Sequence, residues 1–368
     1  MKTLTLVSLG RVKPPLEELE RVEEADGAPR RSMYDRAMDT DLLDEKFLAA
    51  VPPFRRFLYR WFPGYVAQVI EAFIVRNRYD VIVSWAEQLG LLFAALLKVT
   101  GSHPLHYGIF YWVSIPKKAQ LLKRVHTNFT RIFFMSMYQR DFAVNVLGVP
   151  PEKARFLPFH VDEKFWRPMS GKGDVIVTSG REWRDYPTLI RAVTGLDIPC
   201  HIAAKFIPGT KDAWVQEIEA MGPLPGNVSF GANETITEVR DWYARSRFIV
   251  IPVRESEAAV GTTVLLEAMA MGKAVILSGI KGHGAEALQE GKTGLFVKPG
   301  DVQALREAIL HLWNNPDIAE KMGREGRHRV EEFHTMEKWV HTVKRDIENE
   351  LVLRRRTWSH YQVSPSSE

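Results

Sequence analysis

Short apolar runs alternate with helix-like stretches through the first half of the chain. The runs that predict strands span 3–9, 80–84, 106–112, 131–135 and 154–158. Stretches 88–98 and 138–146 have helical character, and a turn with two prolines covers 148–153. Alternation of buried strands and helices is typical of a parallel sheet whose faces are covered by helices.

The same alternation restarts after a Pro- and Gly-containing stretch at 167–173, which we interpret as a linker. Strands are predicted at 174–178, 200–204, 227–230, 248–252 and 274–277, and helices at 188–193, 237–244, 263–271 and 302–314. The pattern predicts an α/β protein of two doubly wound, Rossmann-like domains that face each other across a cleft, with ligands at the carboxyl ends of the strands. The expected boundaries are 1–166 for an N-terminal domain, 167–335 for a C-terminal domain, and 336–368 for a helical tail that packs back towards the first domain.

The composition agrees with this organisation. A chain of 368 residues exceeds one ordinary core, and 45% apolar with 26% charged residues is typical of a folded protein. Cys200 is the only cysteine, so no intramolecular disulfide can form and a cytoplasmic location is expected. The N-terminal apolar run is too short for a signal peptide, and no run approaches the ~20 apolar residues of a membrane span.

Basic residues are concentrated in the middle of the first half. Residues 51–140 contain four Lys and eight Arg against three acidic residues. Such a segment suits an anionic partner, either a membrane surface or a phosphorylated acceptor, or it is simply a solvated basic face. We expect no nucleic-acid partner, because no nucleic-acid reading motif accompanies the charge.

The segment 252–272 combines a strand end, a polar loop and a helix that Gly261-Thr262-Thr263 opens. The first turn of a helix has N–H groups without helical partners and favours negative charge, so a diphosphate fits there. Thr263 and Glu267 are spaced i, i+4 and share a face, which would let Glu267 accept hydrogen bonds from a ribose. The spacing alone favours an ordinary crossover helix with one exposed Glu.

A second segment, 178–189, ends a strand in a glycine turn. Arg181 and Arg184 follow that turn, and Pro187 opens the next helix. Two guanidinium groups at the carboxyl end of a strand can clamp a diphosphate. A pair of surface arginines is the other interpretation.

These segments, together with 267–276, 291–301, 147–153 and 157–162, resemble the ordered motifs of glycosyltransferase family 4, whose members are retaining enzymes of GT-B fold. The resemblance covers about residues 130–335 and leaves the first ~100 residues without a diagnostic motif. It implies transfer of a sugar from a nucleoside-diphosphate sugar to a hydroxyl of a glycan, glycolipid or small molecule, with retention and with neither cofactor nor metal.

The resemblance also implies roles for individual residues. Arg181 and Arg184 would contact the donor diphosphate, and Glu267, the second Glu of the family's E-x7-E pair, would bind the ribose. The other implied donor-binding residues are Ser179, Gly180, Thr235, Ile236, Glu257, Gly261, Thr262 and Thr263. The backbone at Thr235-Ile236 would contact the base edge.

One departure affects the site. The first Glu of the pair falls at Ala259, so Glu255 or Glu257 would have to reach the transferred sugar. This departure keeps open a catalytically silent sugar-nucleotide-binding protein, and the shared fold keeps open a sugar-nucleotide epimerase.

The first half offers several further candidates. His106, His126 or Tyr111-Trp112 would stand where family members have a first-domain histidine. Asp39-Thr40-Asp41 resembles a metal-binding D-x-D motif, but we interpret it as the solvated face of a helical stretch. The segment 54–62 mixes arginines with aromatic residues and predicts peripheral contact with an anionic membrane through Arg55, Arg56, Arg60 and Trp61. In the following stretch, 66–76, we expect one apolar stripe to pack on the first sheet, made of Val66, Val69, Ile70, Phe73 and Ile74.

Overall fold

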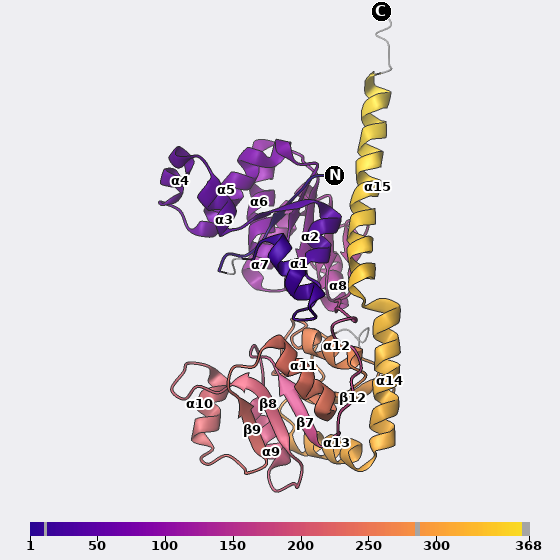
Figure 1. Ribbon diagram of the computed structural model, residues 1–368. Coiled ribbons are helices and arrows are strands. Elements are labelled where there is room, and N and C mark those ends of the chain that lie inside the picture. The colour runs from indigo at the N-terminus through magenta and orange to yellow at the C-terminus, as the bar shows by residue number, and fades with distance from the viewer. Residues whose placement is uncertain (11–12, 284–287, 363–368) are drawn as a thin grey trace, which may run out of the picture. The chain divides into compact units, whose positions relative to one another are not determined.

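The computed structural model describes residues 1–10, 13–283 and 288–362 (Figure 1). The chain divides into two units, each built on a six-stranded sheet. The first unit comprises Met1–Leu19, Arg31–Leu157 and Glu337–Glu368, and the second comprises Glu20–Arg30 and Pro158–Met336. The two parallel α/β sheets confirm the predicted fold class.

The first sheet is parallel throughout and has the order β2-β1-β3-β4-β5-β6. Its strands are β1 (Thr3–Leu6), β2 (Thr40–Leu43), β3 (Val81–Ser84), β4 (His106–Phe110), β5 (Arg131–Phe134) and β6 (Ala154–Phe156). The strand β2 corrects our interpretation of 39–41: Asp39 ends a helix in the left-handed conformation, and Asp41 lies within the strand. The carboxylate of Asp41 accepts a hydrogen bond from Tyr79 at 2.7 Å.

The helices of the same part of the chain are α1 (Leu16–Glu24), α2 (Ser32–Met38), α3 (Glu45–Ala50), α4 (Pro53–Tyr59), α5 (Gly64–Val75), α6 (Glu87–Thr100), α7 (Pro116–Val125) and α8 (Met137–Asn145). The buried face of α5 includes Val69, Ala72 and Val75, which pack with β1 and β3 residues, whereas Ile74 of the expected stripe is exposed. The stripe is therefore rotated from the predicted one, because buried Glu71 and Gln68 occupy part of the inward face.

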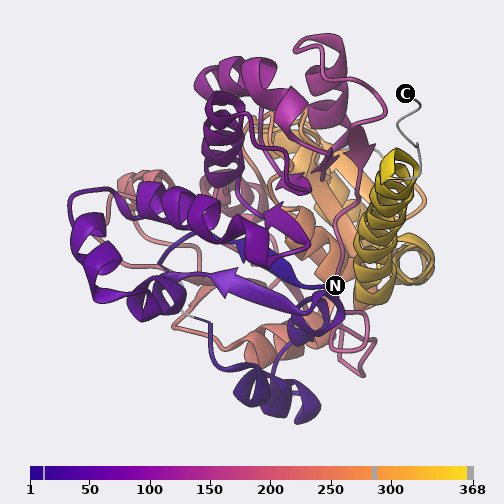
Figure 2. The same ribbon diagram turned by 90° about the horizontal axis from the view of Figure 1, so that it is seen from above.

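The long helix α15 (Met336–Gln362) returns to the first sheet (Figures 1 and 2). Asp346 of this helix lies 2.7 Å from Nε of Arg131 and accepts a hydrogen bond from the Tyr107 hydroxyl at 3.2 Å. Near the start of the helix, the Trp339 ring stacks on Trp85, with 5.3 Å between ring centroids. The helix α15 is thus held on the unit that contains β1.

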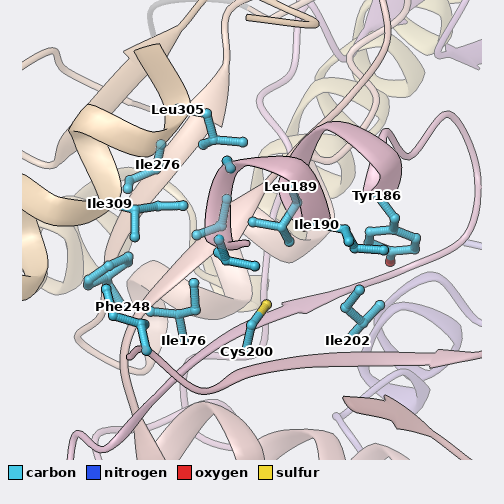
Figure 3. Packing of buried hydrophobic residues seen from close by; sticks show 14 of the residues in the cluster. Ile176, Tyr186, Leu189, Ile190, Cys200, Ile202, Phe248, Ile276, Leu305 and Ile309 are labelled. Atoms are coloured by element: carbon cyan, nitrogen blue, oxygen red, sulfur yellow. The ribbon is translucent and has the colours of Figure 1, made fainter. Parts of the chain in front are cut away.

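The second sheet is also parallel, with the order β12-β11-β10-β7-β8-β9. Its strands are β7 (Val175–Ser179), β8 (Cys200–Lys205), β9 (Val228–Gly231), β10 (Ser246–Ile251), β11 (Ala274–Ser278) and β12 (Gly294–Val297). Its helices are α9 (Tyr186–Val193), α10 (Ala213–Ala220), α11 (Ile236–Arg245), α12 (Thr262–Ala270), α13 (Val302–Asn314) and α14 (Pro316–Phe333). Figure 3 shows one face of this sheet, where Ile176, Phe248 and Ile276 pack against residues of α9 and α13.

Candidate donor site in the second unit

The two segments singled out in the sequence meet at the carboxyl edge of the second sheet. Strands β7 and β10 are neighbours, so the loops that follow them leave the sheet side by side. The backbone joins these loops directly: Arg254 N–H donates to the Trp183 carbonyl at 3.0 Å, and Asp185 N–H donates to the Pro252 carbonyl at 3.0 Å. Parallel pairing therefore brings together segments about 70 residues apart in the sequence.

Arg184 lies at the centre of this meeting point and is buried, with 5% exposure. Its Nε donates to the Ser179 carbonyl at 2.8 Å, and its Nη1 donates to the Glu182 carbonyl at 3.2 Å. Gly180 has a φ of +94°, and a Cβ there would lie 2.4 Å from Nη2 of Arg184. The glycine is needed for the left-handed backbone and for the close approach of the guanidinium.

The start of α12 borders the same guanidinium. Gly261 caps the helix with a φ of +87°, and a Cβ built on it would lie 3.7 Å from Nη1 of Arg184. Thr262 donates its hydroxyl to the Ala259 carbonyl at 2.8 Å, while Thr263 is exposed. A buried arginine and the N–H groups of a first helical turn together form a positive region suited to a diphosphate.

Glu267 lies one turn into α12 and is half-buried. It is close enough to Tyr243 of α11 to raise the pKa of that phenol, although burial is the larger cause of the increase. The Tyr243 hydroxyl is hydrogen-bonded to Ser179 Oγ at the end of β7. Glu267, Tyr243 and Ser179 thus connect α12, α11 and β7 beside the Arg184 guanidinium.

Arg181 occupies a different position from Arg184. Its side chain is 59% exposed and its Nη2 lies 2.8 Å from Oδ2 of Asp212, the residue that precedes α10. The structure therefore brings Arg184 to the start of α12 and holds Arg181 on an exposed ion pair.

The backbone of Thr235 is used within α11. Its N–H donates to Oε2 of Glu238 at 2.7 Å, and its Oγ1 accepts the N–H of Glu238 at 3.3 Å, which completes a capping box. Its carbonyl accepts the N–H of Val239 at 3.0 Å. Thr235 itself is exposed and Ile236 is half-buried. A base edge would accordingly have to use other backbone groups than the N–H of Thr235.

The loop before α12 has a buried apolar section. Ala259 and Val260 are only 4% and 5% exposed, whereas Glu257 is half-buried and Glu255 is exposed. His283, from the loop after β11, contacts the Val260 carbonyl through Nε2 and lies 3.2 Å from the Ser278 carbonyl through Nδ1. Burial lowers the pKa of His283. Sequence reasoning missed this residue, whose one signal is its place just after a strand end.

The first unit has a cavity of about 380 Å³ at the carboxyl ends of β1, β2 and β3. Its lining residues are Val7, Ser8, Lys13, Pro14, Leu19, Arg31, Tyr34, Asp35, Leu42, Asp44 and Trp85. Lys13 and Asp35 form an ion pair, and the Tyr34 and Trp85 rings meet edge-on at 4.7 Å. No local motif marks this cavity, because its residues come from separate segments of the chain.

The predicted first-half histidines lie elsewhere. His106 is completely buried among Phe93 and Phe129, and desolvation lowers its pKa to about 3. His126 begins a short turn of 3-10 helix. The backbone N–H groups of Tyr111 and Trp112 both donate to Glu87 Oε1, at 2.6 and 2.7 Å.

Among residues 1–10, 13–283 and 288–362, no cluster of His, Cys, Asp and Glu side chains could hold a metal ion. Within the same ranges, no helix has the length and apolar character needed to span a membrane.

Comparison with solved structures extends over nearly the whole chain. Sucrose-phosphate synthase (tll1590) from Thermosynechococcus elongatus matches with a TM-score of 0.72 at 17% identity, covering 98% of this chain and 100% of that chain. Anabaena Alr3699/HepE in complex with UDP and glucose matches with a TM-score of 0.68 at 15% identity, covering 96% and 99%. These structural similarities and the two parallel six-stranded sheets show that the fold is of the GT-B type.

The sequence similarities are to glycosyltransferases and cover part of the chain. Residues 174–315 match the family model "Glycosyl transferases group 1". The GDP-mannose-dependent alpha-(1-6)-phosphatidylinositol monomannoside mannosyltransferase of Mycobacterium tuberculosis is 25% identical over 240 residues, which cover 60% of this chain and 62% of the relative. D-rhamnosyltransferase WbpZ of Pseudomonas aeruginosa is 38% identical over 88 residues, covering 24% and 23%. Residues 174–315 are thus similar to group 1 glycosyltransferases, and the chain spans less than two thirds of the length of these curated relatives.

Proposed function

We propose that this chain transfers a sugar from a nucleoside-diphosphate sugar to an acceptor hydroxyl, with retention. The observation that carries the proposal is the position of buried Arg184 between Gly180 and Gly261, at the start of α12. Negative charge grows on the leaving diphosphate in the transition state, and preorganised positive groups stabilise it there. The guanidinium of Arg184 and the N–H groups of the first turn of α12 supply this stabilisation without a metal.

The other donor contacts follow from the same arrangement. Glu267 lies one turn along α12, on the side of Tyr243, and accepts the ribose hydroxyls in this proposal. Arg181 contacts the diphosphate after leaving Asp212, a surface partner with which its ion pair is weak. Glu257 and the loop around buried Ala259 line the site of the transferred sugar.

The experiment that tests this proposal is a donor panel. The purified chain is incubated with UDP-, GDP-, ADP- and dTDP-sugars, and release of the nucleoside diphosphate is followed with time. Release from one donor that is lost in Arg184→Ala supports the proposal. Binding of a donor without release by the wild-type chain would favour a catalytically silent sugar-nucleotide-binding protein, the alternative that Ala259 motivates.

We further propose that the first-unit cavity binds the acceptor. It combines the Trp85 and Tyr34 rings with the Lys13–Asp35 ion pair, a mixture of apolar faces and charged hydrogen-bonding groups that suits a saccharide. The mycobacterial relative is named for a phosphatidylinositol monomannoside acceptor. A glycan or the sugar headgroup of a glycolipid is therefore the acceptor that we favour over a small molecule.

A conservative substitution tests the acceptor assignment. In Asp35→Asn we expect the acceptor-dependent rate to fall roughly ten-fold, because a charged hydrogen-bonding group is lost. Slow donor hydrolysis in the absence of acceptor should not change. The control is Asp41→Asn, in strand β2 of the same unit and outside the cavity lining. Equal effects of the two substitutions, or a loss of donor hydrolysis in Asp35→Asn, would contradict the assignment.

We also propose that the protein works in the cytoplasm at the inner face of the membrane, where it would meet an acceptor carried by a lipid.

A further inference from the structure

The segment 52–65, which contains α4, exposes a cluster of large apolar side chains. Figure 1 shows α4 at the outer edge of the first unit, beyond α5. Trp61, Phe54 and Phe57 are 78%, 72% and 57% exposed. The other exposed large apolar residues of the segment are Leu58, Phe62 and Tyr65. Soluble surfaces rarely gather so many large apolar side chains in one short segment, so this one requires an explanation.

The orientation of α4 explains why these residues face solvent. Arg55 and Tyr59 are spaced i, i+4 and are the only residues of 52–65 that are not exposed. The Tyr59 hydroxyl donates to Glu71 Oε2 at 2.6 Å, and Nη2 of Arg55 lies 3.5 Å from Glu71 Oε1. The Glu71 side chain is only 1% exposed, and these two groups are partners of its buried carboxylate.

The helix α4 therefore has its polar and apolar faces reversed relative to an ordinary surface helix. A surface helix normally buries its apolar stripe and exposes its polar face. In α4 the polar pair is held inward by Glu71, and the aromatic face is presented outward. Leaving such rings in water forgoes the free energy that burial would provide, which is a substantial cost unless something else covers the surface.

The charge around the cluster points to an anionic occupant. Residues 46–70 contain four basic residues and no acidic residue. Arg56 and Arg60 are exposed beside the aromatic side chains. Rings that enter the headgroup layer beside arginines that contact lipid phosphates are the pattern of an interfacial membrane segment. A second copy of the same segment would instead oppose arginine to arginine, without carboxylates to pair them.

We propose that the basic–aromatic surface of 52–65 docks the first unit onto an anionic lipid bilayer. Phe54, Phe57 and Trp61 enter the headgroup layer, and Arg56 and Arg60 contact lipid phosphates. Arg55 does not take part, because Glu71 holds it inward. Docking would place the acceptor-side unit against the surface that carries a glycolipid, so the inference adds a partner to the proposed function, although docking itself needs no donor.

Vesicle flotation tests the docking without any nucleotide sugar, so its failure is distinguishable from failure of the proposed activity. The full chain is mixed with phosphatidylcholine vesicles that contain or lack phosphatidylglycerol, at low and at high salt. We expect the protein to float with phosphatidylglycerol vesicles at low salt, less at high salt, and not with phosphatidylcholine alone. Recovery of the protein away from both vesicle types at low salt would overturn the proposal.

Surface variants assign the binding to this segment. Phe57→Ser combined with Trp61→Ser should reduce vesicle binding at least ten-fold. Arg56→Ala combined with Arg60→Ala should reduce it roughly ten- to thirty-fold, since each basic residue near an anionic surface contributes about 1 kcal/mol. Val99→Ser, at another highly exposed apolar residue of the same unit, is the matched control and should bind like the wild type.

Two further measurements distinguish a lipid bilayer from a second copy of the chain as the partner of this surface. Brominated lipids should quench wild-type tryptophan fluorescence more than that of Trp61→Phe, because Trp61 is placed in the headgroup layer. Sedimentation of the free protein shows whether it self-associates. Wild-type vesicle binding by the Phe57→Ser/Trp61→Ser protein would contradict the inference. A dimer that the same pair of substitutions dissociates would identify a second copy as the occupant and would also overturn it.

Discussion

The carboxyl edges of the two sheets are built in different ways. In the second unit, two contiguous segments, 178–185 and 252–267, supply Gly180, Arg184, Gly261 and Glu267 to one edge. In the first unit, the cavity draws on residues that follow β1, lie in α1 and α2, and end β2 and β3. Both sheets are parallel, but only the second has an edge whose candidate site residues can be recognised as a motif within short stretches of sequence.

The difference teaches what kind of site a sequence can reveal. In general, a diphosphate binds at the start of a helix and beside glycines with positive φ, and both features can be recognised in a few consecutive residues. A cavity lined by Trp85, Tyr34 and the Lys13–Asp35 pair depends on chain segments that only the sheet brings together. If the two edges differ in this way, substitutions at the carboxyl edge of the second sheet will alter donor binding and nucleoside diphosphate release. Substitutions at the carboxyl edge of the first sheet will not.

The largest effect is expected for Arg184→Ala. Loss of a preorganised donor to the leaving diphosphate should reduce the rate of nucleoside diphosphate release about 100-fold. Arg191→Ala, at an exposed arginine of α9, is the control for loss of a positive charge in the same unit. Arg184 also donates a hydrogen bond to the Ser179 carbonyl, so its loss can affect stability. Thermal unfolding of the variant must therefore be measured together with the rate. Near-normal release by a folded Arg184→Ala protein would remove this residue from the proposed mechanism.

The next effect concerns donor affinity. Glu267→Ala should weaken donor binding by ~1–3 kcal/mol, since it removes a charged hydrogen-bond acceptor from an otherwise intact helix. Titration calorimetry with the donor found in the panel measures the change. Glu320→Ala, at an exposed carboxylate of α14, serves as the control. Unchanged affinity in Glu267→Ala would contradict its assignment to the ribose.

A smaller effect, on stability rather than activity, tests whether His106 is a buried core residue of the first unit and not a site residue. Burial holds the pKa of His106 at about 3, below the ordinary value of 6.5, so the unfolded chain binds a proton in this range that the folded chain does not. The stability contribution is present above pH 6.5 and is lost as the pH falls towards 3. At pH 5 the loss should be about 2 kcal/mol.

Urea unfolding of the wild type and His106→Gln at pH 8 and pH 5 measures this loss. The variant should be less sensitive to the pH change, while exposed His103→Gln should behave like the wild type. An unchanged pH dependence in His106→Gln would mean that the histidine is not held neutral. Donor release by His106→Gln should stay normal if His106 is a core residue.

The smallest effect is expected for Arg181→Ala. Its guanidinium is mostly exposed and paired with Asp212, so solvent screens its charge and we expect no more than about a five-fold loss of turnover. In the double variant with Arg184→Ala the two losses should not add, because both groups act on one diphosphate. A loss as large as that of Arg184→Ala would show that the two arginines act as an equal clamp.

Much of the second unit could be predicted from residues alone. The strands at 174–178, 248–252 and 274–277 correspond to β7, β10 and β11, because fully buried parallel strands are short, continuous apolar runs. The helix that Gly261-Thr262-Thr263 opens is α12. By contrast, β2 and β12 escaped prediction, since each is a four-residue edge strand with little apolar pattern of its own.

The sequence by itself determined two parallel α/β units and the local chemistry of glycine, arginine and glutamate after β7 and β10, since these features need only short-range patterns. The tertiary structure decided which of the two arginines lies beside the start of α12 and which pairs with Asp212, because that depends on the pairing of β7 with β10. It also decided that α4 presents its aromatic residues outward. Periodicity cannot foresee this orientation, because it is imposed by a buried carboxylate, Glu71, on the neighbouring helix.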